Sequence, residues 1–168
     1  YENLQSVRER DNFYLSSVDI CNYELLKTVF KLAPWDIVVH CAASYKDPTN
    51  WRRDAEVNCV GTANLLKLCI ESPIKRMIYF QTSLCYGTNP ICLDKWEHEV
   101  PLSINTRIDP APNSYAITKT AAEQLIEMSG VPFISFRLAN CYGPRNLSGP
   151  IPIFFKNITI GKISIISI

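Results

Sequence analysis

The feature that most constrains the fold of this chain is a repeated change in the spacing of its apolar residues. Short runs rich in β-branched and aromatic residues, typical of strands, occupy residues 12–18, 35–39, 76–82 and 131–138. Elsewhere apolar residues recur three or four positions apart, which predicts helices over residues 23–32, 54–70 and 113–128. Strands that alternate with helices form α/β domains with a parallel sheet, so we predict this fold class.

Residues that favour helix ends stand at the borders of these segments. Asn22 is placed to cap the first helix, and Pro34 follows its end. Gly130 follows the last helix, where glycine commonly terminates helices. Residues 90–112 are polar and irregular, which predicts a long loop.

Composition excludes several classes of protein. The 168 residues include 17 Lys or Arg and 16 Asp or Glu, which gives a net charge of +1. This balance lacks the basic surplus of nucleic-acid-binding proteins, and no apolar run approaches the ~18 residues of a membrane span. We therefore expect neither a nucleic-acid partner nor a membrane partner.

The cysteines are typical of a reducing compartment. The chain has seven of them, scattered and without a C-x-x-C pair. Zinc ribbons and thioredoxin-like sites need such pairs, so we predict no metal site. Free cysteines in apolar runs pack as small hydrophobic residues, and this pattern favours a cytoplasmic location.

Parallel sheets bind ligands beyond the carboxyl ends of their strands. In this sequence those ends fall at residues 19–20, 40–45, 82–87 and 139–145. Three of them are rich in polar, small or glycine residues, and the first offers a single carboxylate. We therefore expect the functional site at these positions.

Tyr115 and Lys119 stand four residues apart in the last predicted helix, so their side chains share one face. A phenol has an ordinary pKa of about 10, and a neighbouring ammonium group stabilises the phenolate. Tyr115 is therefore a candidate acid/base residue. The same spacing also occurs on solvated helix faces, so the pair alone leaves both interpretations open.

Four further segments accompany this pair in a fixed order: Ile37-Val-Val-His40-Cys-Ala-Ala43, Val57-Asn58-Cys-Val-Gly61-Thr62-Ala-Asn64-Leu-Leu66, Tyr79-Phe-Gln-Thr82-Ser-Leu-Cys-Tyr86-Gly87 and Arg137-Leu-Ala-Asn140-Cys-Tyr-Gly143-Pro144. Together with the Tyr–Lys pair they resemble the extended short-chain dehydrogenase/reductase family. Within that family they are most similar to the NAD-dependent nucleotide-sugar epimerase/dehydratase branch, of the UDP-glucose 4-epimerase type. The resemblance covers nearly the whole chain and implies a Rossmann-like, doubly wound parallel sheet.

The resemblance implies that NAD is the cofactor and that the strand ends bind it. Asp19 and Ile20 match the pair that holds the adenine ring. Cys41, Ala42 and Ala43 match a turn of small residues beneath the ribose and phosphates. Asn58 matches a residue that braces the strand before this turn. Tyr115 and Lys119 match residues near the nicotinamide ribose, and Leu138 and Ala139 match residues along the nicotinamide.

The resemblance also implies the catalytic set Thr82, Tyr115 and Lys119. Thr82, Asn140 and Arg145 match positions that contact the nucleotide-sugar substrate. In a 4-epimerase, the tyrosine removes the proton of the 4-hydroxyl, hydride passes to NAD, and the keto sugar is reduced again from its other face.

Two alternatives to a 4-epimerase remain open. The first is a 4,6-dehydratase, a branch that usually carries an acidic pair directly after the catalytic Thr. This chain has Ser83 and Leu84 there, and neither supplies a carboxyl group. The second alternative is a non-catalytic Rossmann-like module or an inactive fragment.

One departure from the family pattern concerns the glycine-rich turn that binds pyrophosphate, because the six glycines of this chain do not form it. We therefore expect residues 1–168 to be the central part of a single NAD(P)-binding Rossmann-like domain. Residues 151–168 are expected to begin the substrate-binding portion, and the fragment alone is expected to be inactive. The resemblance further implies a homodimer that forms through the helices at 54–70 and 113–128.

Overall fold

The computed structural model describes residues 4–45, 47–88, 91–94, 97–144, 146 and 149–161. It divides into two compact units. We call residues Ser16–Ala139 the central unit, and residues 1–15 together with 140–168 the terminal unit. Among the described residues, no helix is both long enough and apolar enough to cross a membrane.

The central unit is built on a parallel sheet of β1 (Ile37–His40), β2 (Arg76–Thr82) and β3 (Phe133–Leu138), in the order β1-β2-β3. Ile37 pairs with Arg76, and Met77 pairs with Phe133. Helical segments form the two crossovers, from β1 to β2 and from β2 to β3, as parallel pairing requires. The predicted α/β class with a parallel sheet is confirmed.

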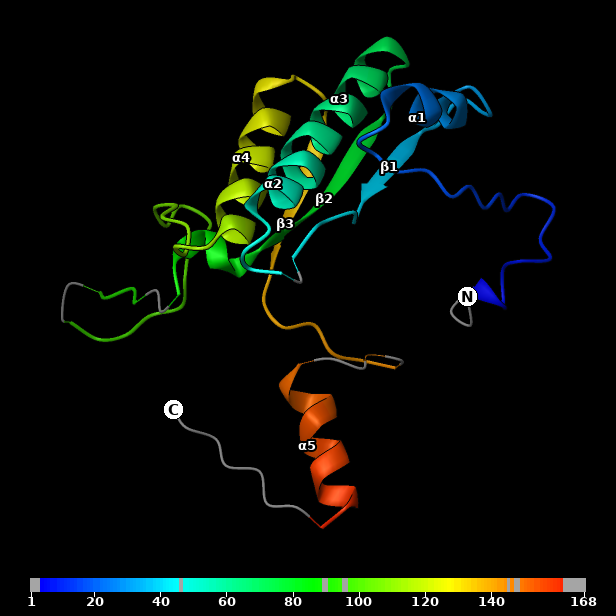
Figure 1. Cartoon of the computed structure of the whole chain (residues 1–168). Helices are drawn as coiled ribbons and strands as arrows, with labels where there is room; N and C mark the ends of the chain where they lie inside the picture. The colour runs from blue at the N-terminus through cyan, green and yellow to red at the C-terminus, as the bar shows by residue number, and fades with distance from the viewer. Residues whose placement is uncertain are drawn as a thin grey trace. The chain divides into compact units, whose positions relative to one another are not determined.

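Helices cover one face of this sheet (Figure 1). In chain order they are α1 (Tyr23–Phe30), α2 (Trp51–Asp54), the π-helix η2 (Ala55–Gly61), α3 (Thr62–Glu71), the short 3₁₀ helix η3 (Ser83–Tyr86) and α4 (Ser114–Met128). Asn22 caps α1 by accepting a hydrogen bond from the backbone N–H of Leu25. Gly130, just beyond α4, has φ 74°, the left-handed conformation that glycine adopts without strain.

Two expected elements differ from the structure. The helix predicted over 54–70 begins earlier, at Trp51, and contains the π-helical turns of η2. Residues 12–18, predicted as a strand, are not assigned as one, because they pair with no described strand. Apolar spacing reports burial and cannot by itself show whether a neighbouring strand lies within hydrogen-bonding reach.

The core of the central unit lies between the sheet and the helices. Met77 and Tyr79 of β2 and Ile126 of α4 are completely buried there. Side chains of a strand alternate between faces, so the neighbouring residues point to the other side of the sheet. On that side Ile37, Val39, Ile134 and Phe136 are exposed. In the terminal unit, α5 (Pro150–Thr159) begins after Gly149.

A close approach fixes the segment that precedes α1 against η2. A Cβ atom at Gly61 would lie 2.5 Å from Cδ1 and 2.6 Å from Cγ1 of Ile20. The Asn64 side chain donates hydrogen bonds to the carbonyl oxygens of Ile20 (3.0 Å) and Cys21 (3.2 Å). The absence of a side chain at Gly61 therefore allows the Asp19–Ile20 segment to reach the helix.

We expect Gly61→Ala to lower the free energy of unfolding by about 1–3 kcal/mol, because the added methyl group overpacks the contact with Ile20. Urea unfolding of the single variants and of Gly61→Ala combined with Ile20→Ala measures the coupling. The double variant should lose less stability than the sum of the two single losses. If the stability losses of the two single variants simply add in the double variant, the contact between residues 61 and 20 does not limit the packing.

Candidate active site

The first two turns of α4 carry Tyr115 and Lys119. Asn113 caps this helix by accepting a hydrogen bond from the backbone N–H of Ala116 at 2.8 Å. The Lys119 side chain is buried, with 2% of the residue exposed, and its Nζ lies 3.9 Å from the centre of the Tyr79 ring. Thr82, at the end of β2, lies near Tyr115, and its hydroxyl acts to lower the pKa of the phenol. The structure thus brings Thr82 and Tyr115 near each other, one helical turn from Lys119.

Burial dominates the protonation of both α4 residues. It raises the pKa of Tyr115, while the nearby Thr82 hydroxyl acts in the opposite direction. Burial also lowers the pKa of Lys119 to about 8, although Cys41 and Glu123 act to raise it. The expected lowering of the Tyr115 pKa by Lys119 is therefore wrong for this structure. The desolvation of the phenol prevails, and the ammonium group lies over the Tyr79 ring.

A groove of about 630 Å³ opens between the end of β1, the segment before α1 and the start of the α2–η2 helix. Four of the predicted cofactor residues lie together along it: Asp19, Ile20, Ala42 and Ala43. Tyr45 also lines this groove, and its ring centre lies 6.1 Å from that of Tyr115. The groove therefore reaches the neighbourhood of the Tyr–Lys pair.

The carboxylate of Asp19 is held in its charged form at the edge of the groove. It accepts a hydrogen bond from the backbone N–H of Cys21 at 2.9 Å and forms an ion pair with Arg53 at 3.0 Å. These two interactions lower the pKa of Asp19 to about 2. The groove thus ends in a fixed hydrogen-bond acceptor.

Asn58 joins the turn after β1 to helix α4. Its Oδ1 accepts from the backbone N–H of Ser44 at 2.9 Å, and its Nδ2 donates to the Ser44 carbonyl oxygen at 3.1 Å. The same Nδ2 donates to Oγ1 of Thr118 at 2.9 Å. Because Asn58 is buried and all these contacts are satisfied, it fixes the small-residue turn relative to α4.

The other predicted site residues are placed as follows. Cys41 is exposed at the end of β1, and its thiol interacts electrostatically with Lys119. Leu138 and Ala139 lie at the carboxyl end of β3. Asn140 belongs to the terminal unit, and Arg145 lies outside the described residues.

Gln81 is a site residue that the sequence did not reveal. Its Oε1 accepts from the backbone N–H of Thr82 at 2.9 Å, and its Nε2 donates to the Lys119 carbonyl oxygen at 3.0 Å and to Glu123 at 3.2 Å. The Tyr79 hydroxyl donates to the same Lys119 carbonyl at 3.0 Å. The signal was a polar residue on the buried face of β2, in phase with Met77 and Tyr79.

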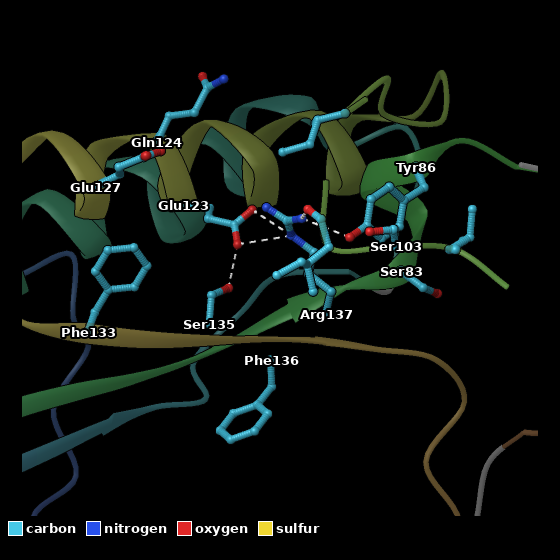
Figure 2. A pocket seen from close by; sticks show the side chains of 13 residues that line it. Ser83, Tyr86, Ser103, Glu123, Gln124, Glu127, Phe133, Ser135, Phe136 and Arg137 are labelled. Carbon is cyan, nitrogen blue, oxygen red and sulfur yellow. Dashed lines mark hydrogen bonds and ion pairs between the residues drawn. The ribbon is translucent and has the colours of Figure 1, made fainter. Parts of the chain in front are cut away.

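Glu123 extends this network towards β3, as Figure 2 shows. It accepts a hydrogen bond from Ser135 and forms an ion pair with Nε of Arg137 at 3.2 Å. Arg137 also donates to the Tyr86 hydroxyl at 2.8 Å. These residues line a second cavity of about 650 Å³, between α4, β3 and the loop after η3.

His40 is buried behind the site and is neutral in the folded state. The Thr62 hydroxyl donates to the Asn58 carbonyl oxygen at 2.6 Å, so Nε2 of His40 is the donor in the 2.8 Å contact with Thr62. Burial, assisted by the charge of Lys119, lowers the pKa of His40 to about 4. His40 therefore has a structural role, as a neutral donor to the Thr62 hydroxyl.

We expect the protein to lose stability as the pH falls from 6.5 towards 4. The His40 pKa is 6.5 without perturbation and about 4 in the fold, so between these values the unfolded chain binds a proton that the folded chain does not. His40→Gln should flatten this part of the stability–pH curve, measured by urea unfolding. His98→Gln, which removes an exposed histidine, is the control and should keep the slope. An unchanged slope in His40→Gln would contradict the assignment.

The parallel sheet and the small-residue turn at the end of β1, together with the Tyr–Lys pair on α4, define a Rossmann-like protein with a short-chain dehydrogenase/reductase site. The model of the NAD dependent epimerase/dehydratase family matches residues 2–168. The chain belongs to this family, whose members use NAD.

Three comparisons illustrate the relationship. The chain is 30% identical, over 95% of its length, to dTDP-D-glucose 4,6-dehydratase of Dictyostelium discoideum. It is 28% identical, over 86% of its length, to UDP-glucuronate 4-epimerase of Thermodesulfobacterium geofontis. The crystal structure of the Bordetella bronchiseptica enzyme WbmH in complex with NAD+ matches with a TM-score of 0.80 and 41% identity over 92% of the chain. The chain spans 39%, 44% and 49% of the respective lengths of these proteins.

Proposed function

We propose that this chain is the central part of a nucleotide-sugar 4-epimerase that uses NAD. The observation that carries the proposal is that Thr82 lies near Tyr115, one helical turn from the buried Lys119, next to the groove along Asp19 and Ala42. Relatives that act on nucleotide sugars, by epimerisation or by dehydration, support the substrate class. Because the chain spans less than half of these relatives, the activity belongs to the whole enzyme.

The residues of the groove fit NAD. Ala42 and Ala43 have side chains small enough for a ribose and phosphates to approach the backbone, and the ionised Asp19 offers an acceptor to an adenosine. The buried ammonium group of Lys119 is suited to donate hydrogen bonds to the hydroxyls of the nicotinamide ribose. When bound, the cofactor supplies the acceptor and donor of a hydride.

The side chains of this site divide the proton chemistry between them. Tyr115 acts as the general base that takes the proton of the sugar 4-hydroxyl, and it returns that proton when the sugar is reduced again. The hydroxyl of Thr82 lowers the pKa of Tyr115 and so offsets part of the effect of burial. Asn140 and Arg145 are proposed to contact the substrate.

A 4-epimerase fits this site better than a 4,6-dehydratase. Elimination of water from the sugar needs a further acid and base next to the catalytic threonine. The chain after Thr82 turns directly into η3, where Ser83 and Leu84 occupy the first positions. Neither carries a carboxyl group, so the groups required for elimination are missing from this position. The dehydratase is the second candidate because relatives with that activity match most of the chain.

We also propose the setting in which this site works. Residues 1–168 form the central part of one NAD(P)-binding domain, and the substrate-binding portion begins at residue 151. A homodimer forms through the helices at 54–70 and 113–128, a proposal supported by their exposed apolar side chains Val60, Ile70, Ile117 and Met128. No disulfide joins the described cysteines, which supports a cytoplasmic location.

The reaction product distinguishes the two candidate activities. The whole enzyme, incubated with UDP- and dTDP-hexoses, is expected to give the 4-epimer with the mass of the substrate and without net reduction of NAD. Mass spectrometry and chromatography of the nucleotide sugars measure this. A product lighter by one water would establish the dehydratase instead.

Tyr115→Phe in the whole enzyme is expected to lower kcat by about 10²–10⁴-fold, the usual contribution of general acid–base catalysis. The ring and its packing remain, so circular dichroism should be unchanged. Tyr23→Phe is the matched control, because it removes a phenol that bonds to Glu71 on the surface, away from the site. Wild-type turnover in Tyr115→Phe would refute the proposed role.

A further inference from the structure

Asp54 is a buried acidic residue that takes no part in the proposed proton and hydride transfers. It ends α2, and only 1% of its surface is exposed. Its Oδ1 accepts a hydrogen bond from Oγ of Ser44 at 2.6 Å, and its Oδ2 accepts one from Oγ of Ser114. Within the described ranges no Lys, Arg or His forms an ion pair with it.

The two hydroxyl partners of Asp54 adjoin the two halves of the candidate site. Ser44 follows Ala43 in the turn that lines the groove, and Ser114 precedes Tyr115 at the start of α4. The carboxylate therefore spans the distance between the cofactor turn and the general base. A change in its position moves one half of the site relative to the other.

Asn58, one helical turn after Asp54, repeats this arrangement. It bonds to the backbone N–H and C=O of Ser44 and to the hydroxyl of Thr118, the residue before Lys119. The α4 partners of the two residues thus stand four positions apart, each directly before one member of the Tyr–Lys pair. Asp54 and Asn58, on successive turns of the crossover helix, therefore hold the loop at Ser44 in a fixed position relative to Tyr115 and Lys119.

The chemistry of a carboxylate suits this position. A carboxylate only accepts hydrogen bonds, and it can satisfy two hydroxyl donors at once through separate oxygens. Burying it without a cation costs free energy, which the two hydrogen bonds from Ser44 and Ser114 offset in part. Its presence is explained by the geometry that it imposes on Ser44 and Ser114.

We propose that Asp54 is a positioning residue that sets the distance and orientation of Tyr115 relative to the bound cofactor, an inference that rests on the proposed function. It touches neither substrate nor cofactor and acts through Ser44 and Ser114. Its loss affects the rate of the chemical step and leaves the binding of the sugar nearly unchanged.

Four variants of the whole enzyme test this role through kcat and KM. Ser114→Ala and Asp54→Asn are each expected to lower kcat by about 10- to 100-fold, the usual cost of a small misplacement of reacting groups, with KM for the sugar unchanged. Ser114→Thr keeps a hydroxyl at the same carbon and should restore most of the rate. Thr120→Val is the matched control, since it removes a buried α4 hydroxyl that has no hydrogen-bond partner among the described residues, and its kcat should stay within about twofold of wild type.

Combining Ser114→Ala with Asp54→Asn should cost no more than the larger single effect, because both remove the same contact. Additive losses would overturn the proposal. So would losses of kcat that merely follow the folded fraction measured by circular dichroism, or a Ser114→Thr variant as slow as Ser114→Ala.

A separate readout distinguishes failure of this inference from failure of the proposed function. If the wild-type enzyme converts no nucleotide sugar, the proposed function fails, and NAD affinity measured by calorimetry then tests the link between Asp54 and the turn. Asp54→Asn should weaken NAD binding by about tenfold, whereas Thr120→Val should not. Equal NAD affinity in both variants would overturn the inference.

Discussion

The structure depends on how α4 is held against β2. Ala116 and Ala122 are fully buried, and their small side chains let the helix lie close to the sheet. Between them, the Lys119 carbonyl oxygen accepts hydrogen bonds from Tyr79 and Gln81, although it already lies inside a helix. These bonds fix the helix both along and around its axis, because they are directional where apolar contacts are not. The position of every group at the site follows from this attachment.

A second set of polar contacts joins the crossover after β1 to the same helix. The η2 segment buries Asn58 against α4, while Gly61 lets Ile20 approach from the opposite side. A π-helical stretch shifts the direction of the residues after it relative to a regular α-helix, and such stretches frequently occur at functional sites. The crossover helix thereby connects the Asp19–Ile20 end of the groove with the Tyr–Lys pair.

Burial sets the pKa values of Lys119 and His40 at this site. Lys119 loses solvation beneath the helices, and its charge helps to keep the nearby His40 neutral. In the Glu123–Arg137 ion pair each partner satisfies the other, and Ser135 and Tyr86 complete its hydrogen bonds. The region combines the buried cation of Lys119 near the groove with the Glu123–Arg137 ion pair beyond it.

The sequence by itself determined the order of strands and helices, since apolar spacing and capping residues such as Asn22 and Asn113 act over a few neighbouring positions. It also indicated Tyr115 and Lys119, because a spacing of four places two side chains on one helix face. Only the tertiary structure decided that Gln81 and Asp54 bear on the site and that burial, not Lys119, governs the Tyr115 pKa. Their partners lie 38 and 60 residues away along the chain, and desolvation depends on everything that packs around a group, which no local pattern encodes.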